Sequence, residues 1–225
     1  MNKAFIFDMD GVIIADESKK KEALNEVWPE LVGSQIASVF RIPVGQTPLS
    51  IYSEAVKHGA TISEEQFMSE FEKVALRIYN ESPITSDMDK LGEYLLSKEY
   101  KIGVVSSAKK EWMEIVLKRL AFGDKISAVV SINDHRELKP KPHPGGYLEA
   151  IAELGAISDT TIILEDSNSG IQAAKSAGAY TIGLTSNLLP EYTQHGADIY
   201  ANNVAEVIAI VEKFPEKFSP DAHVV

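Results

Sequence analysis

Carboxylate and hydroxyl side chains follow three short apolar runs of the chain, and their types could support metal and phosphate chemistry. These side chains are Asp8, Asp10, Ser106, Glu165 and Asp166. If they converge, each pair of carboxylates a few ångströms apart repels by roughly 4 kcal/mol at an effective dielectric constant near 20. A cation would relieve this repulsion, and a site made of oxygen ligands favours Mg²⁺ or Ca²⁺ over zinc. Taken one at a time, each of these residues could instead be a helix cap or a turn residue without a catalytic role.

The runs that precede these residues have the length and composition of buried parallel strands. Five such runs cover residues 4–7, 101–105, 128–131, 160–164 and 180–184. Helical patterns lie between and after them, at residues 87–98, 111–120, 146–154, 171–177 and 204–214. This alternation predicts an α/β fold with a doubly wound, Rossmann-like parallel sheet. Because ligands of such sheets bind at the carboxyl ends of the strands, we expect the acidic and hydroxyl side chains to share one edge.

The alternation is interrupted by a long block without a convincing strand, residues 15–83. Helical patterns occupy residues 19–27, 48–58 and 63–79 within it. Because this block directly follows the first strand, we predict an α-helical cap inserted into the sheet domain. The expected domains are therefore a core, residues 1–14 and 84–225, and a cap, residues 15–83.

The overall charge limits the partners. The 225 residues carry a formal net charge of −11, and a surface this acidic repels nucleic acid and anionic membranes, so we expect neither as a partner.

The chain has no cysteine, which excludes disulfides, thiol nucleophiles and Cys-ligated zinc. The apolar run before Asp8 is too short for a signal peptide or a membrane span, which favours a cytoplasmic protein. We expect a monomer or a small homo-oligomer.

Four segments together resemble the signatures of the haloacid dehalogenase superfamily in its phosphatase form. They are residues 8–13, Ser106, residues 141–144 with Tyr147, and residues 165–171. The subgroup that the chain most resembles has a small helical cap and includes sugar-phosphate phosphatases, phosphoglycolate phosphatases and β-phosphoglucomutases. The resemblance implies a small phosphomonoester as substrate and Mg²⁺ as cofactor.

The resemblance also implies roles for the acidic residues. Asp8 would attack phosphorus and form an aspartyl-phosphate, for which an ionised carboxylate needs no base. Asp10 would protonate the leaving group and then accept a proton from water, and its backbone carbonyl would bind the metal. Asp8 and Asp166 would be metal ligands, and Glu165 would support the metal directly or through water.

A lysine and two serines are expected to hold the phosphoryl oxygens. The resemblance assigns this part to Ser106, Ser107 and Lys141. Lys139 is also followed by proline, but Tyr147 lies six residues after Lys141, which is the family's usual spacing, so we choose Lys141. The family often has Asp where this chain has Gly145, and this departure could loosen the support of the lysine.

The expected cap supplies two candidate substrate contacts, Gly45 and Arg41. Gly45 lies in a segment, residues 44–48, that resembles the glycine-containing substrate loop of the family's cap. Mutases of the family place a phosphate-binding Arg where this chain has Pro48, and Arg41 nearby could substitute for it. A mutase must bind two phosphates and therefore needs a second basic site in the cap. Because the position that mutases use for this site holds Pro48, we expect a simple phosphatase.

Two alternatives stay open. One is a β-phosphoglucomutase-like phosphosugar mutase. The other is a phospho-accepting signalling domain, which also carries a phosphorylated Asp on a doubly wound sheet. Such a domain has no acid/base group two residues after the nucleophile, so Asp10 and the inserted helical block argue against it.

Overall fold

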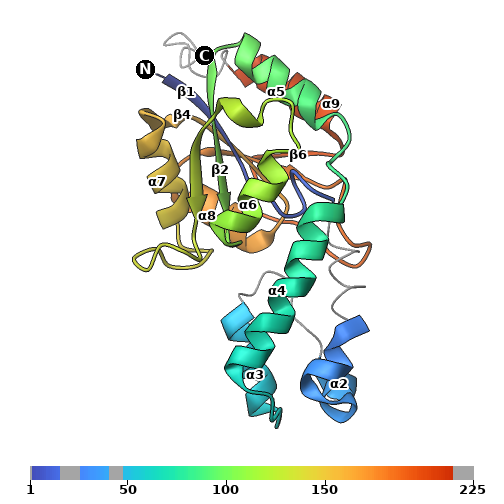
Figure 1. Ribbon diagram of the computed structural model, residues 1–225. Coiled ribbons are helices and arrows are strands. Elements are labelled where there is room, and N and C mark those ends of the chain that lie inside the picture. Colours follow the sequence, from blue (N-terminus) through green and yellow to red (C-terminus); the bar gives the residue numbers. More distant parts are fainter. Residues whose placement is uncertain (1, 16–25, 41–47, 215–225) are drawn as a thin grey trace. The chain divides into compact units, whose positions relative to one another are not determined.

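The computed structural model describes residues 2–15, 26–40 and 48–214 (Figure 1). The chain divides into two compact units: a core unit, Met1–Ala15 with Ile84–Val225, and an inserted unit, Asp16–Pro83. Among the helices of the described ranges, none combines the length and the hydropathy that a membrane span requires.

The core unit is built on a six-stranded sheet in the order β3-β2-β1-β4-β5-β6, and every neighbouring pair is parallel. The strands are β1 (Asn2–Phe7), β2 (Tyr100–Ser106), β3 (Ile126–Ser131), β4 (Ala156–Glu165), β5 (Tyr180–Leu184) and β6 (Ile199–Ala201). The first five overlap the five predicted runs, so the predicted fold class is confirmed. β6 was not predicted, because it is short and two of its three side chains are exposed.

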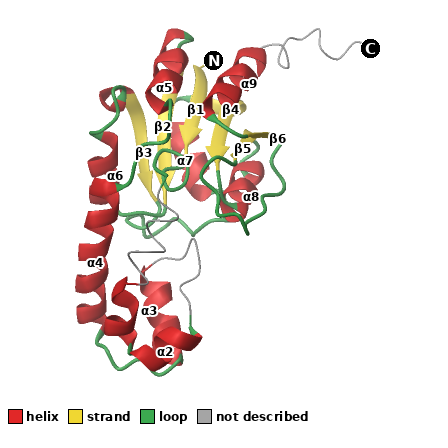
Figure 2. Cartoon of the chain, turned by 90° about the vertical axis from the view of Figure 1, so that its right-hand side faces the viewer, coloured by secondary structure: helices red, strands yellow, loops and turns green. Residues whose placement is uncertain are grey.

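Helices cover both faces of this sheet (Figure 2). They are α5 (Met88–Ser97), α6 (Lys110–Leu117), α7 (Gly145–Glu153), α8 (Asn168–Ser176) and α9 (Val204–Lys213), with a short 3₁₀ turn at Gly123–Lys125. Alternate residues of β1 face opposite layers, as the period of a strand requires. Ala4 and Ile6 belong to the apolar cluster that includes residues of α7 and α8, while Phe5 and Phe7 contact each other in a separate aromatic pair.

The register of the central strand decides which side chains meet at its carboxyl end. Phe7 is the last residue of β1 and lies opposite Val104 of β2 and Leu164 of β4. The next backbone N–H, that of Asp8, donates to the Leu164 carbonyl at 3.0 Å. Asp8 therefore leaves the sheet beside Glu165, the last residue of β4.

The inserted unit consists of helices in its described part. Residues 26–32 are helical and precede α2 (Ser34–Val39), α3 (Pro48–Lys57) and α4 (Glu64–Glu81). The Ser63 side chain caps α4 by accepting from the Gln66 N–H. The unit has its own aromatic core, in which the buried Trp28 donates its indole N–H to the Phe40 carbonyl at 2.9 Å. The predicted helix at residues 19–27 lies mostly outside the described residues.

Candidate active site

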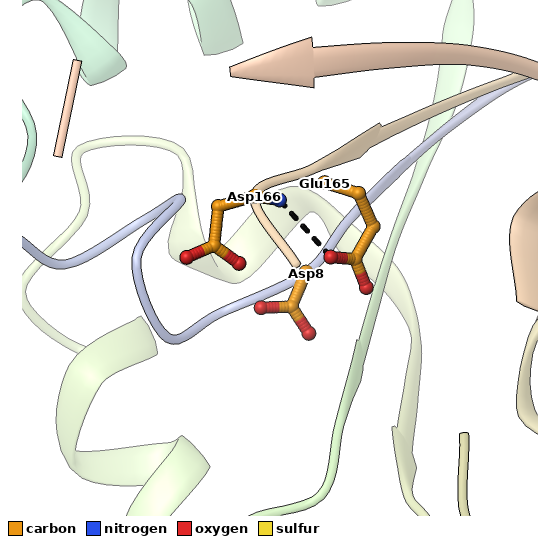
Figure 3. A group of neighbouring side chains, drawn as sticks. All are labelled: Asp8, Glu165 and Asp166. Carbon is orange, nitrogen blue, oxygen red and sulfur yellow. Dashed lines mark hydrogen bonds between the residues drawn. The ribbon is translucent and has the colours of Figure 1, made fainter. Parts of the chain in front are cut away.

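Three buried carboxylates meet at the carboxyl edge of the sheet (Figure 3). Asp8, Glu165 and Asp166 each offer an oxygen, and these oxygens all lie within 4.8 Å of one another. Their residues are only 6%, 0% and 7% exposed. Among the described residues this is the only group of three or more acidic or histidine side chains with metal-binding spacing. An all-oxygen set of this charge fits a hard divalent cation such as Mg²⁺.

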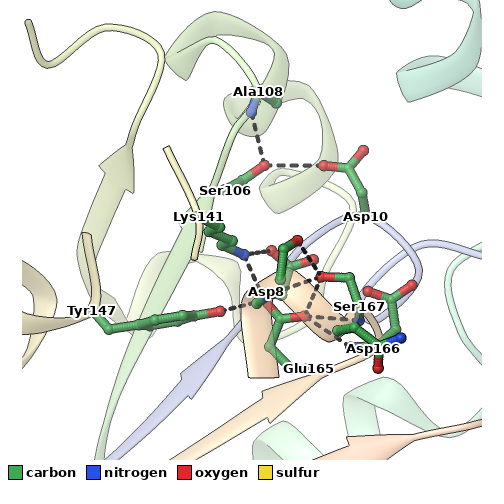
Figure 4. A network of polar contacts seen from close by, with 12 residues as sticks. Asp8, Asp10, Ser106, Ala108, Lys141, Tyr147, Glu165, Asp166 and Ser167 are labelled. Carbon is green, nitrogen blue, oxygen red and sulfur yellow. Dashed lines mark hydrogen bonds and ion pairs between the residues drawn. The ribbon is translucent and has the colours of Figure 1, made fainter. Parts of the chain in front are cut away.

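The Lys141 ammonium lies between two of these carboxylates (Figure 4). Its Nζ is 2.5 Å from Asp8 Oδ1 and 2.6 Å from Glu165 Oε1, and the lysine side chain is 8% exposed. Burial alone would lower the pKa of Lys141, but the Asp8 and Glu165 charges raise it well above its ordinary value. The lysine therefore keeps its positive charge. Lys139, the other candidate, is exposed and has no place in this group.

Glu165 is held by donors on both of its oxygens. Oε1 accepts from Lys141 and from the Tyr147 hydroxyl at 2.6 Å each, and Oε2 accepts from the backbone N–H groups of Asp166 and Ser167 at 3.0 Å each. Burial would raise the pKa of Glu165, but Lys141 and these hydrogen bonds lower it. The direct bonds of Glu165 thus go to Lys141, Tyr147 and the start of α8.

Two glycines make room for the carboxylates. A Cβ built on Gly170, in α8, would lie 1.7 Å from Glu165 Oε1. A Cβ on Gly11, which has φ +80, would lie 1.9 Å from Asp166 Oδ2. Both distances are far below contact, so any side chain at these positions would displace a carboxylate.

Asp10 and Ser106 form a second group beside the carboxylates. Ser106 Oγ donates to Asp10 Oδ2 at 3.0 Å and accepts from the Ala108 N–H at 3.0 Å (Figure 4). Ser106 is fully buried at the end of β2, and Ser107, the next residue, is half-buried. The carboxylate of Asp10 is not part of the three-carboxylate group.

The protonation of Asp8 depends on what surrounds it. The pKa of the Asp8 carboxyl is raised to about 7, because burial and the charges of Glu165 and Asp10 together outweigh the opposing effect of Lys141. A divalent cation beside the carboxylate would stabilise its ionised form and lower this pKa. The site is therefore arranged so that cation binding and ionisation of Asp8 favour each other.

Three residues near this edge were not predicted to belong to the site. The position of Tyr147 was used only to identify the lysine, although its buried hydroxyl donates to Glu165. Thr85 and Asn187, which bond to the turn after Asp10, were not considered. Asn187 comes three residues after the end of β5, so its position at a strand end was a usable signal. Gly45 and Arg41 lie outside the described residues.

Comparisons with known proteins identify a family and several relatives. The model of the haloacid dehalogenase-like hydrolase family matches residues 5–184. The validoxylamine A 7'-phosphate phosphatase of Streptomyces hygroscopicus subsp. limoneus is 28% identical over 209 residues, 92% of this chain and 96% of that protein. A phosphorylated carbohydrates phosphatase of Thermotoga maritima is 28% identical over 181 residues, 78% of this chain and 82% of that protein.

A solved structure has the same fold. The β-phosphoglucomutase of Clostridium difficile superposes with a TM-score of 0.73, covering 96% of this chain and 98% of that one, at 23% identity. At this identity the similarity establishes the fold and does not distinguish a mutase from a phosphatase.

Proposed function

Because the chain belongs to the haloacid dehalogenase-like hydrolase family, we propose that it is an Mg²⁺-dependent phosphatase that hydrolyses a small phosphorylated metabolite through an aspartyl-phosphate on Asp8. Its family and its relatives named as phosphatases make it a phosphoric monoester hydrolase. The observation that carries the detailed proposal is the contact of Asp8 with Lys141 inside the group of three buried carboxylates.

The reaction proceeds in two displacements at phosphorus. An Asp8 carboxylate oxygen bonds to phosphorus while the bond from phosphorus to the ester oxygen breaks, and Asp10 gives its proton to the departing alkoxide. Water then attacks the aspartyl-phosphate, and Asp10 takes a proton from it. Inorganic phosphate leaves, and Asp8 returns to its starting form.

Asp8, Asp166 and the Asp10 carbonyl would hold Mg²⁺, and Glu165 would support it through water. When bound, the cation offsets the negative charge of the carboxylates and of the phosphoryl group that must approach them. We assign Glu165 mainly to Lys141, because both of its oxygens already accept from protein donors.

Lys141 and Ser106 bind the phosphoryl oxygens in this proposal. The lysine has three N–H donors, and Asp8 and Glu165 take two of them. A third remains to bind a phosphoryl oxygen. Ser106 would exchange its bond to Asp10 for a phosphoryl oxygen, which releases the Asp10 carboxylate for proton transfer. Ser107 would add a contact at the same strand end.

We further propose that the inserted unit serves as the cap that chooses the substrate, with Gly45 and Arg41 as contacts. The names of relatives that act on phosphorylated carbohydrates and on validoxylamine A 7'-phosphate support a sugar phosphate or a similar metabolite. A screen of sugar phosphates, phosphoglycolate and nucleotides, with release of inorganic phosphate as the readout, would identify the substrate class.

The metal assignment is tested with p-nitrophenyl phosphate. We expect hydrolysis with Mg²⁺ and none in excess EDTA, with full recovery when Mg²⁺ is added back. Asp166→Asn should raise the Mg²⁺ concentration needed for half-maximal activity about tenfold or more, while Asp159→Asn, which changes the same charge at an exposed position, should leave it unchanged. Activity that persists in EDTA would refute the metal assignment.

A further inference from the structure

The turn that follows Asp10 is fixed by bonds to its consecutive carbonyl groups. Thr85 donates its N–H to the Ile13 carbonyl at 2.9 Å and its hydroxyl to the Val12 carbonyl at 2.6 Å. Asn187 donates from Nδ2 to the Gly11 carbonyl at 2.9 Å. The carbonyl groups of residues 11, 12 and 13 are thus all held by two residues from distant parts of the chain.

These two residues also bind each other. The second proton of Asn187 Nδ2 goes to Thr85 Oγ1 at 2.8 Å. One amide therefore joins the segment after β5 to the turn after β1 and to Thr85. Thr85 is 5% exposed, so water cannot easily replace its bonds, and a lost partner would leave buried polar groups unpaired.

The turn itself closes on Asp10. The Gly11 N–H donates to the Ile14 carbonyl at 2.9 Å, and Asp10 and Ile14 form an isolated bridge. Ile14 also bridges Ile84, the residue before Thr85. The Ile14 N–H also donates to the Met9 carbonyl at 3.1 Å, so the peptides on both sides of Asp10 are bound to Ile14. These bonds fix the direction in which the Asp10 side chain leaves the backbone.

We propose that Asn187, acting with Thr85, is a positioning residue that holds the turn so that the Asp10 carboxyl can reach the leaving group. This inference rests on the proposed role of Asp10 as acid and base. Neither residue would touch the substrate in this reaction. Their effect is to keep a proton donor within hydrogen-bond reach of the ester oxygen, where a shift of about 1 Å is enough to lower the rate severely.

The role makes a specific kinetic prediction. An alkyl phosphate needs a proton on its leaving oxygen, whereas p-nitrophenolate departs without one. A misplaced Asp10 should therefore harm the alkyl substrate selectively. The quantity to compare is kcat/KM, because it reports the steps up to formation of the aspartyl-phosphate and is not affected by the later hydrolysis.

The experiment compares kcat/KM for p-nitrophenyl phosphate and for the best alkyl phosphate of the substrate screen. We expect Asn187→Ala to lower the alkyl value about tenfold or more and the aryl value less than about threefold. Asn2→Ala is the matched control, because Asn2 also donates its amide to a backbone carbonyl, that of Leu154 at 3.0 Å, but at the opposite end of β1. It should change neither value.

Two further variants keep the test decisive. Asp10→Asn, the reference, should lower the alkyl value by about 100-fold or more and the aryl value much less. Thr85→Val keeps the side-chain shape and removes only the hydroxyl, so it should show the same selectivity even if Asn187→Ala folds poorly. Because the two residues share a hydrogen bond, the losses in the double variant should be less than additive in free energy.

The outcomes separate the two claims. If Asp10→Asn is selective but both Asn187→Ala and Thr85→Val lower the two substrates equally, the positioning role is overturned and the proposed function stands. If Asp10→Asn itself lowers both substrates equally, the acid role of Asp10 fails, and the inference fails with it.

Discussion

The Nζ of Lys141 lies 2.6 Å from Oε1 of Glu165, and the two side chains are 8% and 0% exposed. Such a buried pair contributes little net stability relative to an apolar pair, but removing one partner leaves a buried charge without compensation. Since Lys141 also contacts Asp8, loss of the lysine would leave two buried carboxylates facing each other. The arrangement of the buried carboxylates therefore depends on Lys141.

We predict that Lys141→Ala lowers kcat by about 100-fold or more, because a charged donor to the phosphoryl oxygens is lost. The free energy of unfolding should fall by about 3 kcal/mol or more, because Asp8 and Glu165 lose their partner. Lys139→Ala, two residues earlier and exposed, should change both quantities little. Steady-state kinetics and urea unfolding measure the two effects, and the reverse order of severity would show that the lysines are misassigned.

Tyr147→Phe should weaken the site without removing a charge. The change deletes only the hydroxyl that donates to Glu165 Oε1 at 2.6 Å. We expect the unfolding free energy to fall by about 1–3 kcal/mol, as for a buried hydrogen bond to a charged group, and kcat to fall because Glu165 then holds Lys141 less firmly.

Tyr100→Phe is the matched control for this prediction. Tyr100 is 4% exposed, and its hydroxyl has no hydrogen-bond partner among the residues that the structure describes. Removing that hydroxyl should leave kcat unchanged and stability equal or slightly higher. If the two substitutions changed kcat and the free energy of unfolding equally, the bond from Tyr147 to Glu165 would contribute to neither quantity.

The bond between Asp134, in the segment after β3, and Lys110, the first residue of α6, should confer a pH dependence on stability. Asp134 Oδ2 accepts from the Lys110 N–H at 2.7 Å. Burial would raise the pKa of Asp134, but the bonds from Lys110 and Asn133 bring it below its ordinary value. Because the pKa is lower in the folded state, the ionised carboxylate stabilises the fold above the unfolded pKa. This contribution is lost as the pH falls through the folded value.

Asp134→Asn should therefore destabilise the protein most near neutral pH, with the difference from wild type shrinking below about pH 4. Urea midpoints measured across this range provide the comparison. Asp159→Asn makes the same change in net charge at an exposed position and serves as the control. A difference that stays constant or grows toward low pH would contradict the assignment.

The sequence was informative wherever a local pattern determines structure. Buried parallel strands are continuous apolar runs, so β1 and β4 could be recognised together with the acidic residues at their ends, Asp8, Glu165 and Asp166. β6 was not predicted, because a three-residue edge strand has too few buried side chains to form a pattern. In the inserted unit, α2 was missed because its N-cap is Gly33, which provides no side-chain hydrogen bond to mark the start.

Contacts between distant segments account for most of the rest. Glu165 was expected beside the metal, but its bonds to Lys141 and Tyr147 depend on how α7 packs on the sheet. The bond from Asn187 to Gly11 joins residues 176 positions apart, and nothing near either residue indicates the other. The positions of strand ends in the sequence predict which residues come together at the edge of the sheet. Which side chains then bind each other can be known only from the folded structure.

The most direct test of the account is to identify the residue that becomes phosphorylated. The enzyme is mixed with substrate and Mg²⁺, quenched in acid during turnover, and treated with borohydride, which reduces an aspartyl-phosphate to homoserine. Peptide mass spectrometry should then find homoserine at position 8, and find none in Asp8→Asn or in enzyme quenched without substrate. Homoserine at another aspartate, or active enzyme in which Asp8 is never modified, would contradict the assignment of Asp8 as the nucleophile.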